Sequence, residues 1–171
     1  MKVFQSLLLL LITTIYSVNS QHLYDEIKNH KDGVGLWWIG HNGWIIKHVN
    51  LVVSTDLLLD YDKRAMSPPI SVQELGELLD ISFITHGHKD HFNRSTSKWL
   101  ADSSDCLFVI PASWLPIAKE LGIPEKRIKV ATPRNPIEIL GIQVEPLRAI
   151  HGNANFAIYY DANLEDCGYI I

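Results

Sequence analysis

The sequence has few of the features that would set it apart from ordinary globular proteins. It contains only 2 Cys among 171 residues, so a disulfide framework cannot be the basis of its fold. Basic residues do not predominate, because 15 Lys and Arg stand beside 19 Asp and Glu, and this excludes nucleic-acid binding through excess positive charge. No low-complexity tract or charge block divides the chain. With 47% hydrophobic residues, it is expected to form one domain with a substantial core.

Long apolar runs are also missing, except near the N-terminus. Met1-Lys2 precedes the apolar residues 7–12, and Val18-Asn19-Ser20 is typical of a small-residue cleavage signal. The run is shorter than the ~20 residues that span a bilayer. Residues 1–20 are therefore predicted to be a signal peptide and residues 21–171 an exported domain, periplasmic or secreted, without a stable membrane span. An uncleaved anchor is the alternative.

Export makes a disulfide chemically possible for the two cysteines. Cys106 and Cys167 allow a single pairing, and two separate thiols fit the sequence as well. The oligomeric state is left open.

Residues 21–171 alternate short β-rich runs with helical segments. A Ser71–Glu74 capping box predicts a helix through about residue 79, and further helices are expected at 93–101 and after a cap at Ser113. The expected strands are 36–39, 44–48, 51–54, 81–85, 106–110, 128–131, 137–140, 142–147, 156–160 and 168–171. The fold class is α/β (or α+β) with a mixed sheet that begins antiparallel. Because the last strand-like run stops at the end of the sequence, an incomplete chain is expected.

Four potential metal ligands lie within six residues, directly after the expected strand 81–85. They are His86, His88, Asp90 and His91. Residues two apart in extended backbone point to the same side, so His86 and His88 can converge on one ion. Asp90 and His91 fall where the chain turns, and can face a second ion nearby. Imidazoles and carboxylates suit zinc, manganese or iron.

Residues 85–91, Thr-His-Gly-His-Lys-Asp-His, resemble the His-x-His-x-Asp-His signature of the metallo-β-lactamase fold superfamily. Residues 38–46 resemble the branch that contains ascorbate-6-phosphate lactonase-like hydrolases and the phospholipase D enzymes acting on N-acyl phosphatidylethanolamines. The resemblance covers most of residues 36–171. It implies a four-layer αββα sandwich whose second half is incomplete in this chain.

The resemblance also implies ligand roles. His86 and His88 would bind a first metal ion together with His151, which follows a β-rich run, although His151 could also be a loop residue without a metal. Asp90 and His91 would bind a second ion. The family's later bridging Asp and final His have no counterpart here, so the chain by itself is expected to show little or no hydrolysis.

Two further residues resemble positions that support the ligands in the family. Asp56 resembles an Asp that braces the metal loop through hydrogen bonds, and a turn-forming role is the alternative. His41 lies in the Gly-His-Asn-Gly turn and is expected to make a structural hydrogen bond.

The function that the resemblance implies is metal-dependent hydrolysis outside the cytoplasm. One or two divalent ions, zinc foremost and Mn²⁺ or Fe²⁺ otherwise, would supply a metal-bound hydroxide that Asp90 orients. The bond cleaved would be an ester, lactone, amide or phosphodiester in a small molecule or lipid, and nucleic acid is not expected as a partner. The alternative is a degenerate family member that binds metal without catalysis and serves as a binding or interaction module.

Several aromatic and basic residues have less specific interpretations. Trp37, Trp38 and Trp44 are expected in the core, with a substrate pocket as the alternative. Lys63 and Arg64 are expected to be solvated surface charges, although an anionic substrate group could bind there.

Overall fold

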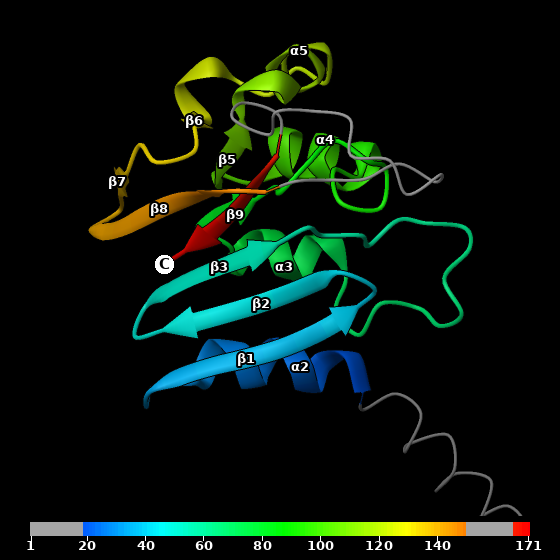
Figure 1. Cartoon of the computed structure of the whole chain (residues 1–171). Coiled ribbons are helices and arrows are strands. Elements are labelled where there is room, and N and C mark those ends of the chain that lie inside the picture. The colour runs from blue at the N-terminus through cyan, green and yellow to red at the C-terminus, as the bar shows by residue number, and fades with distance from the viewer. Residues whose placement is uncertain (1–18, 150–165) are drawn as a thin grey trace, which may run out of the picture.

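Two β-sheets and a set of helices form three layers in the computed structural model, which describes residues 19–149 and 166–171 (Figure 1). The larger sheet has the strand order β1 (Val34–Gly40), β2 (Gly43–His48), β3 (Leu51–Thr55), β4 (Ile81–Phe83), β5 (Leu107–Pro111) and β6 (Ile128–Ala131). The smaller sheet consists of β7 (Ile137–Ile139), β8 (Ile142–Arg148) and β9 (Cys167–Ile170). The helices are α2 (Asn19–Asn29), α3 (Val72–Leu78), α4 (Arg94–Ser103), α5 (Leu115–Glu120) and the 3₁₀ turns η1 (Ala112–Trp114) and η2 (Glu125–Arg127).

The larger sheet is mixed, as its sequence predicts. β1, β2 and β3 pair antiparallel through tight turns, and β3, β4, β5 and β6 are parallel. The three parallel pairs need crossovers, which contain α3, α4 and, between β5 and β6, α5 with the turns η1 and η2. The capping box at the start of α3 is present, with Ser71 accepting from the Glu74 backbone and Glu74 accepting from the Ser71 backbone.

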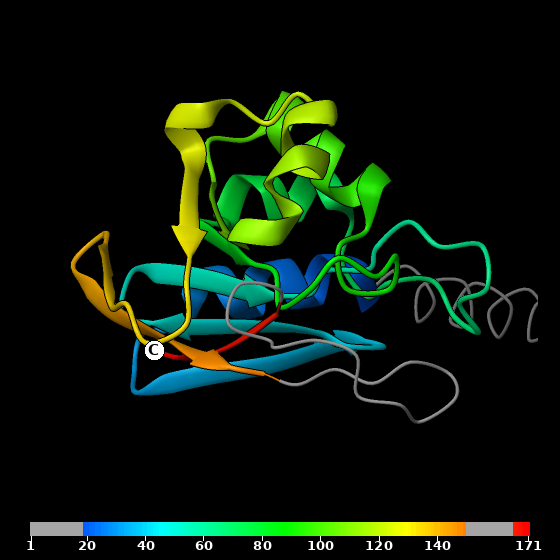
Figure 2. The same ribbon diagram turned by 45° about the horizontal axis from the view of Figure 1, so that its top comes forward.

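The two faces of the larger sheet each bury a separate core. Neighbouring strand residues point to opposite faces, so Val52 packs with the helices whereas Val53 packs with the smaller sheet. On β5, Phe108 likewise packs in the helix-side core and Val109 in the core between the sheets. Figure 2 shows α3, α4 and α5 grouped together, away from β8 and β9. The described chain thus contains an α layer and two β layers of the predicted sandwich.

Helix α2 is attached to the sheet by a buried lysine. Lys47 on β2 donates hydrogen bonds to the backbone oxygens of Ile27 and Lys28, at 2.7 and 2.8 Å. These carbonyls lie near the C-terminal end of α2, where a cation is favoured and the backbone oxygens lack helical partners. Helix α2 is therefore an integral part of the helical layer.

Three local predictions differ from the structure. Ser113 does not cap a helix, because it lies inside η1 and α5 begins after Trp114 without a side-chain cap. Trp38 and Trp44 are paired across β1 and β2 but are 58% and 43% exposed, so the prediction that they are core residues was wrong. They lie on the sheet face away from the helices, opposite to Trp37 and Ile45. Trp37, on the other face, does pack against the helix-side core.

The two cysteines are free and buried in different cores. Cys106 lies in the helix-side core and Cys167 in the core between the sheets. Within the described residues, no helix is long and apolar enough to cross a membrane. The predicted signal peptide lies outside the described residues except for its last two positions, as do His151 and the predicted strand 156–160.

Candidate metal centre

The predicted ligands among the described residues lie at the carboxyl edge of the parallel strands, where open α/β sheets place their functional groups. Asp56 directly follows β3, and residues 84–92, here named the metal loop, follow β4. The loop turns back at His88, whose carbonyl accepts hydrogen bonds from the amides of His91 and Phe92. The Phe92 side chain is fully buried and anchors the end of the loop before α4 begins. The polar residues of the loop thus lie between the buried apolar side chains of Ile84 and Phe92.

Asp56 is the hydrogen-bond centre behind the metal loop. Its carboxylate is 5% exposed and accepts bonds from the Thr85 amide (2.9 Å), the Thr85 hydroxyl (2.7 Å) and Nδ1 of His91 (2.9 Å). Because a carboxylate can only accept, His91 carries its proton on Nδ1 and directs the lone pair of Nε2 away from Asp56. The backbone of Asp56 has a φ of 44°, an unfavourable value for a residue with a side chain.

Thr85 fixes the position of the proton on the His86 ring in a similar way. Its hydroxyl donates to Asp56 and lies 3.0 Å from Nδ1 of His86, so the hydroxyl oxygen accepts the proton on that nitrogen. His86 then carries a lone pair on Nε2, which lies 3.1 Å from Nδ1 of His88. Two nitrogens at ~2.0–2.1 Å from a tetrahedral zinc ion are about 3.3 Å apart, so this pair fits one ion. His86 is buried, whereas His88 is exposed.

A second group of polar side chains surrounds His91. Its ring centroid lies 3.9 Å from that of His86, and its Nε2 lies 2.8 Å from Nδ2 of Asn42 and 3.7 Å from Oδ2 of Asp90. On the other side of Asp90, Nε2 of His41 is 3.4 Å away. His41 and Asn42 form the turn between β1 and β2, so the hairpin tip closes over the metal loop.

The electrostatics of this group favour charged forms. Burial lowers the pKa of His91, but its hydrogen bond to Asp56 and the charges of Asp56, Asp90 and Asp166 outweigh burial and raise the pKa overall. Burial raises the pKa of Asp90, whereas a backbone hydrogen bond, His41 and His91 lower it, and the net shift is downward. A positive charge at this point is therefore stabilised by the surrounding carboxylates.

Side chains outside the motif also hold the metal loop in place. The Arg94 guanidinium donates to the carbonyls of Phe92 and Gly87 and thus joins the two ends of the loop. A side chain at Gly87 would overlap the Trp114 ring, so glycine is required for this close packing. Trp114 donates through Nε1 to the buried carboxylate of Asp166, at 3.2 Å.

The structure brings six of the seven predicted site residues together, and the seventh, His151, lies outside the described residues. The six are His41, Asp56, His86, His88, Asp90 and His91. Among the residues that the structure describes, no three His, Cys, Asp or Glu side chains are arranged to hold one ion. The described side chains supply a pair of imidazole nitrogens, Nε2 of His86 and Nδ1 of His88, that lie 3.1 Å apart.

Sequence reasoning missed three residues that contact this group. Asn42 and Thr85 lie directly beside predicted site residues in the sequence, so the turn and the strand end could have indicated them. Asp166 lies beside no predicted site residue in the sequence, so nothing local indicated it. It lies near the metal loop because β9 follows it directly, and there the amide of Cys167 donates to the carbonyl of Thr85 and the Tyr169 hydroxyl to that of Ile84.

Of the comparisons with known proteins, only the one with solved structures finds matches, and it identifies the fold of this chain. No protein-family model matches the sequence, and no curated protein does. Among solved structures, Igni18, a metallo hydrolase from the archaeon Ignicoccus hospitalis, matches 80% of this chain with a TM-score of 0.58 and 14% identity. An isothiocyanate hydrolase from Delia radicum gut bacteria also matches 80%, with a TM-score of 0.58 and 17% identity. The described chain has part of the metallo-β-lactamase fold.

These similarities are structural and have two clear limits. This chain spans 55% of Igni18 and 57% of the isothiocyanate hydrolase, so it corresponds to little more than half of each. CmlA, a diiron β-hydroxylase from Streptomyces venezuelae, matches equally well, with a TM-score of 0.57, 19% identity, 82% of this chain and 27% of its own. The same fold therefore carries different reactions, and the chemistry of this chain has to be argued from its site.

Proposed function

We propose that this chain is part of a metal-dependent hydrolase that acts outside the cytoplasm. The observation that carries the proposal is the convergence of His86 and His88, with the Asp56–Thr85 hydrogen bonds fixing the proton of His86 on the nitrogen away from His88. Similarity to solved metallo-hydrolases supports the reaction class. The N-terminal sequence pattern supports export.

Each site residue has a proposed role. His86 and His88 would hold one divalent ion, with His151 as a third ligand, and zinc suits this set of imidazoles best. Asp90 and His91 would hold a second. Bound there, such ions would lower the pKa of a bound water molecule toward about 7 and would polarise the bond to be cleaved.

The chain's own residues prepare this chemistry. Asp56, directly and through Thr85, places the proton of the neutral His91 and His86 rings on Nδ1, which leaves Nε2 of each as the ligating nitrogen. Asp90 is 42% exposed and held between His41 and His91, so its carboxylate can orient an attacking water. The substrate would be an ester, lactone, amide or phosphodiester of a small molecule or lipid, as in the lactonase-like and phospholipase D-like branch.

Metal analysis with a matched pair of variants tests the proposal. The purified chain is expected to bind zinc, and His88→Ala is expected to abolish metal content at this site. His48→Ala is the control, because His48 is an exposed histidine at the far end of β2. Unchanged zinc stoichiometry in His88→Ala would overturn the ligand assignment. A screen of ester and phosphodiester substrates then tests hydrolysis.

A second candidate function is metal binding without catalysis. It needs only the converging imidazoles of His86 and His88, and solved structures with this fold carry different reactions. Zinc binding together with no turnover on any ester, lactone, amide or phosphodiester, in the chain and in any longer form of the protein, would favour this alternative over the hydrolase.

A further inference from the structure

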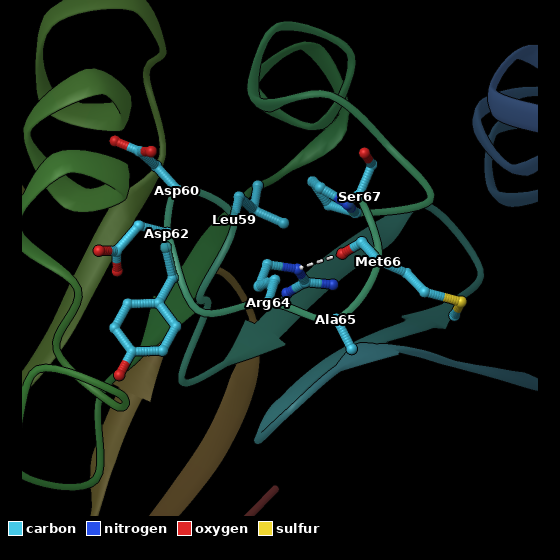
Figure 3. Close-up of a pocket in the computed structure, with 9 residues that line it drawn as sticks. Leu59, Asp60, Asp62, Arg64, Ala65, Met66 and Ser67 are labelled. Carbon is cyan, nitrogen blue, oxygen red and sulfur yellow. Dashed lines mark hydrogen bonds between the residues drawn. The ribbon is translucent and has the colours of Figure 1, made fainter.

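A hollow lies beside the candidate metal centre, formed by residues 57–69, here named the pocket loop. It has a volume of about 420 Å³ and is lined by residues between Leu59 and Pro68 (Figure 3). The beginning of the loop is attached to α4, because the Thr96 hydroxyl accepts hydrogen bonds from the amides of Leu59 and Asp60, at 3.2 and 3.3 Å. Its later part depends on a different residue, Arg64.

Arg64 donates to three backbone carbonyls through three different nitrogens. Nε donates to Met66 (3.2 Å), Nη1 to Leu58 (2.5 Å) and Nη2 to Ile39 (2.8 Å). Two of these carbonyls belong to the pocket loop, and the third belongs to β1. The planar guanidinium can make three bonds in fixed directions, which the single nitrogen of a lysine cannot do. The prediction that Arg64 is a solvated surface charge was therefore wrong.

The contact with β1 lies immediately before the hairpin tip. Gly40 has a φ of 99°, and a Cβ there would overlap the Arg64 guanidinium, so strand and arginine are in close packing. His41, the next residue, has a φ of 53°, a backbone conformation that is unfavourable for a residue with a side chain. A strained turn of this kind persists only when its surroundings hold it, and Arg64 is one of the groups that hold it.

The hairpin tip in turn contacts the metal loop at two points. His41 lies 3.4 Å from Asp90, and Asn42 lies 2.8 Å from His91. On its outer side, His41 faces the Tyr61 ring of the pocket loop, with 6.4 Å between ring centroids. A continuous set of contacts thus leads from Arg64 through the end of β1 to the proposed ligands of the second ion.

We propose that Arg64 is a positioning residue that fastens the pocket loop to the end of β1 and so sets where the His41–Asn42 turn meets Asp90 and His91. The expected effect on metal affinity rests on the proposed function. Its structural part, the coupling of the pocket loop to the hairpin tip, is independent of any activity.

The test compares Arg64→Ala and Arg64→Lys with two controls in the 171-residue chain. Lys63→Ala removes the neighbouring exposed cation, and Thr96→Val loosens the beginning of the pocket loop without touching β1. Amide hydrogen exchange is measured at residues 39–43 and 57–69 without metal, and zinc affinity is measured by competition with a chelating dye.

Both Arg64 variants are expected to raise exchange at the hairpin tip as well as in the pocket loop, and to weaken zinc binding about 10-fold, as is typical when groups that orient ligands are lost. Thr96→Val should raise exchange in the pocket loop alone and leave zinc affinity unchanged, and Lys63→Ala should change neither. Increased exchange confined to residues 57–69 in Arg64→Ala, or full rescue by Arg64→Lys, would overturn the inference. If the unmodified chain binds no zinc, the proposed function fails while the exchange measurement still decides the coupling.

Discussion

Asp56→Asn is the substitution that most directly tests how the metal loop is organised. The amide keeps the shape of the carboxylate but replaces one acceptor oxygen with a donor. In the native protein Oδ2 accepts from both the Thr85 hydroxyl and Nδ1 of His91, at 2.7 and 2.9 Å. An NH₂ group at this place would face the proton on Nδ1, so the proton is expected to move to Nε2 of His91.

Two effects of measurable size follow. Hydrogen bonds to a charged group contribute about 1.5–3 kcal/mol, so the free energy of unfolding without metal is expected to fall by about 2 kcal/mol. For a domain of this size, that corresponds to a decrease in Tm of about 4–8 °C. Zinc affinity at the His91 position is expected to fall 10- to 100-fold, because the ligating nitrogen now carries a proton.

Thermal and urea denaturation in a chelator, zinc titration and ¹⁵N NMR of the histidine ring nitrogens measure these three outcomes. Asp102→Asn is the control, because Asp102 forms an exposed pair with Lys98, which contributes at most ~0.5 kcal/mol. If Asp56→Asn unfolds like the control and His91 keeps its proton on Nδ1, the hydrogen-bond account of this site is wrong.

Two more predictions concern stability. Ser71→Ala removes the side-chain cap of α3 and is expected to lower the free energy of unfolding by about 1 kcal/mol, measured by urea denaturation, whereas Ser71→Asp should retain most of the cap. Burial raises the pKa of Cys106, and it raises that of Cys167 from 9.0 to about 11. Both thiols should therefore resist alkylation by iodoacetamide at pH 8 until the protein is denatured. Above pH 9 the unfolded chain loses these protons before the folded chain does. The contribution of the thiols to the free energy of unfolding should therefore be complete below pH 9 and decline toward pH 11. Constant stability across this range would contradict the burial of the thiols.

Much of the fold follows from local sequence patterns. The β1–β2 hairpin, the capped helix α3 and the buried strand β4 each depend on residues within a few positions of one another, and the structure contains all three. The exposed Trp38 and Trp44 show where such reasoning ends. Their alternation with Trp37 indicates two faces of a strand, but which face is covered depends on other elements of the molecule.

The sequence by itself determined the spacing of His86, His88, Asp90 and His91 on one loop after a buried strand, because short-range geometry fixes which of these side chains share a side. Only the tertiary structure decided how other segments contact this loop. Asp56 reaches it because the parallel strands β3 and β4 end at a common edge, whereas the hairpin tip between β1 and β2 and Asp166 before β9 reach it through contacts between segments that are far apart in the chain. Arg64 is bonded to the backbone whereas Lys63 is exposed, and this difference also depends on tertiary structure. The β1 residue to which Arg64 donates lies 25 residues away in the chain, a separation that no local pattern encodes.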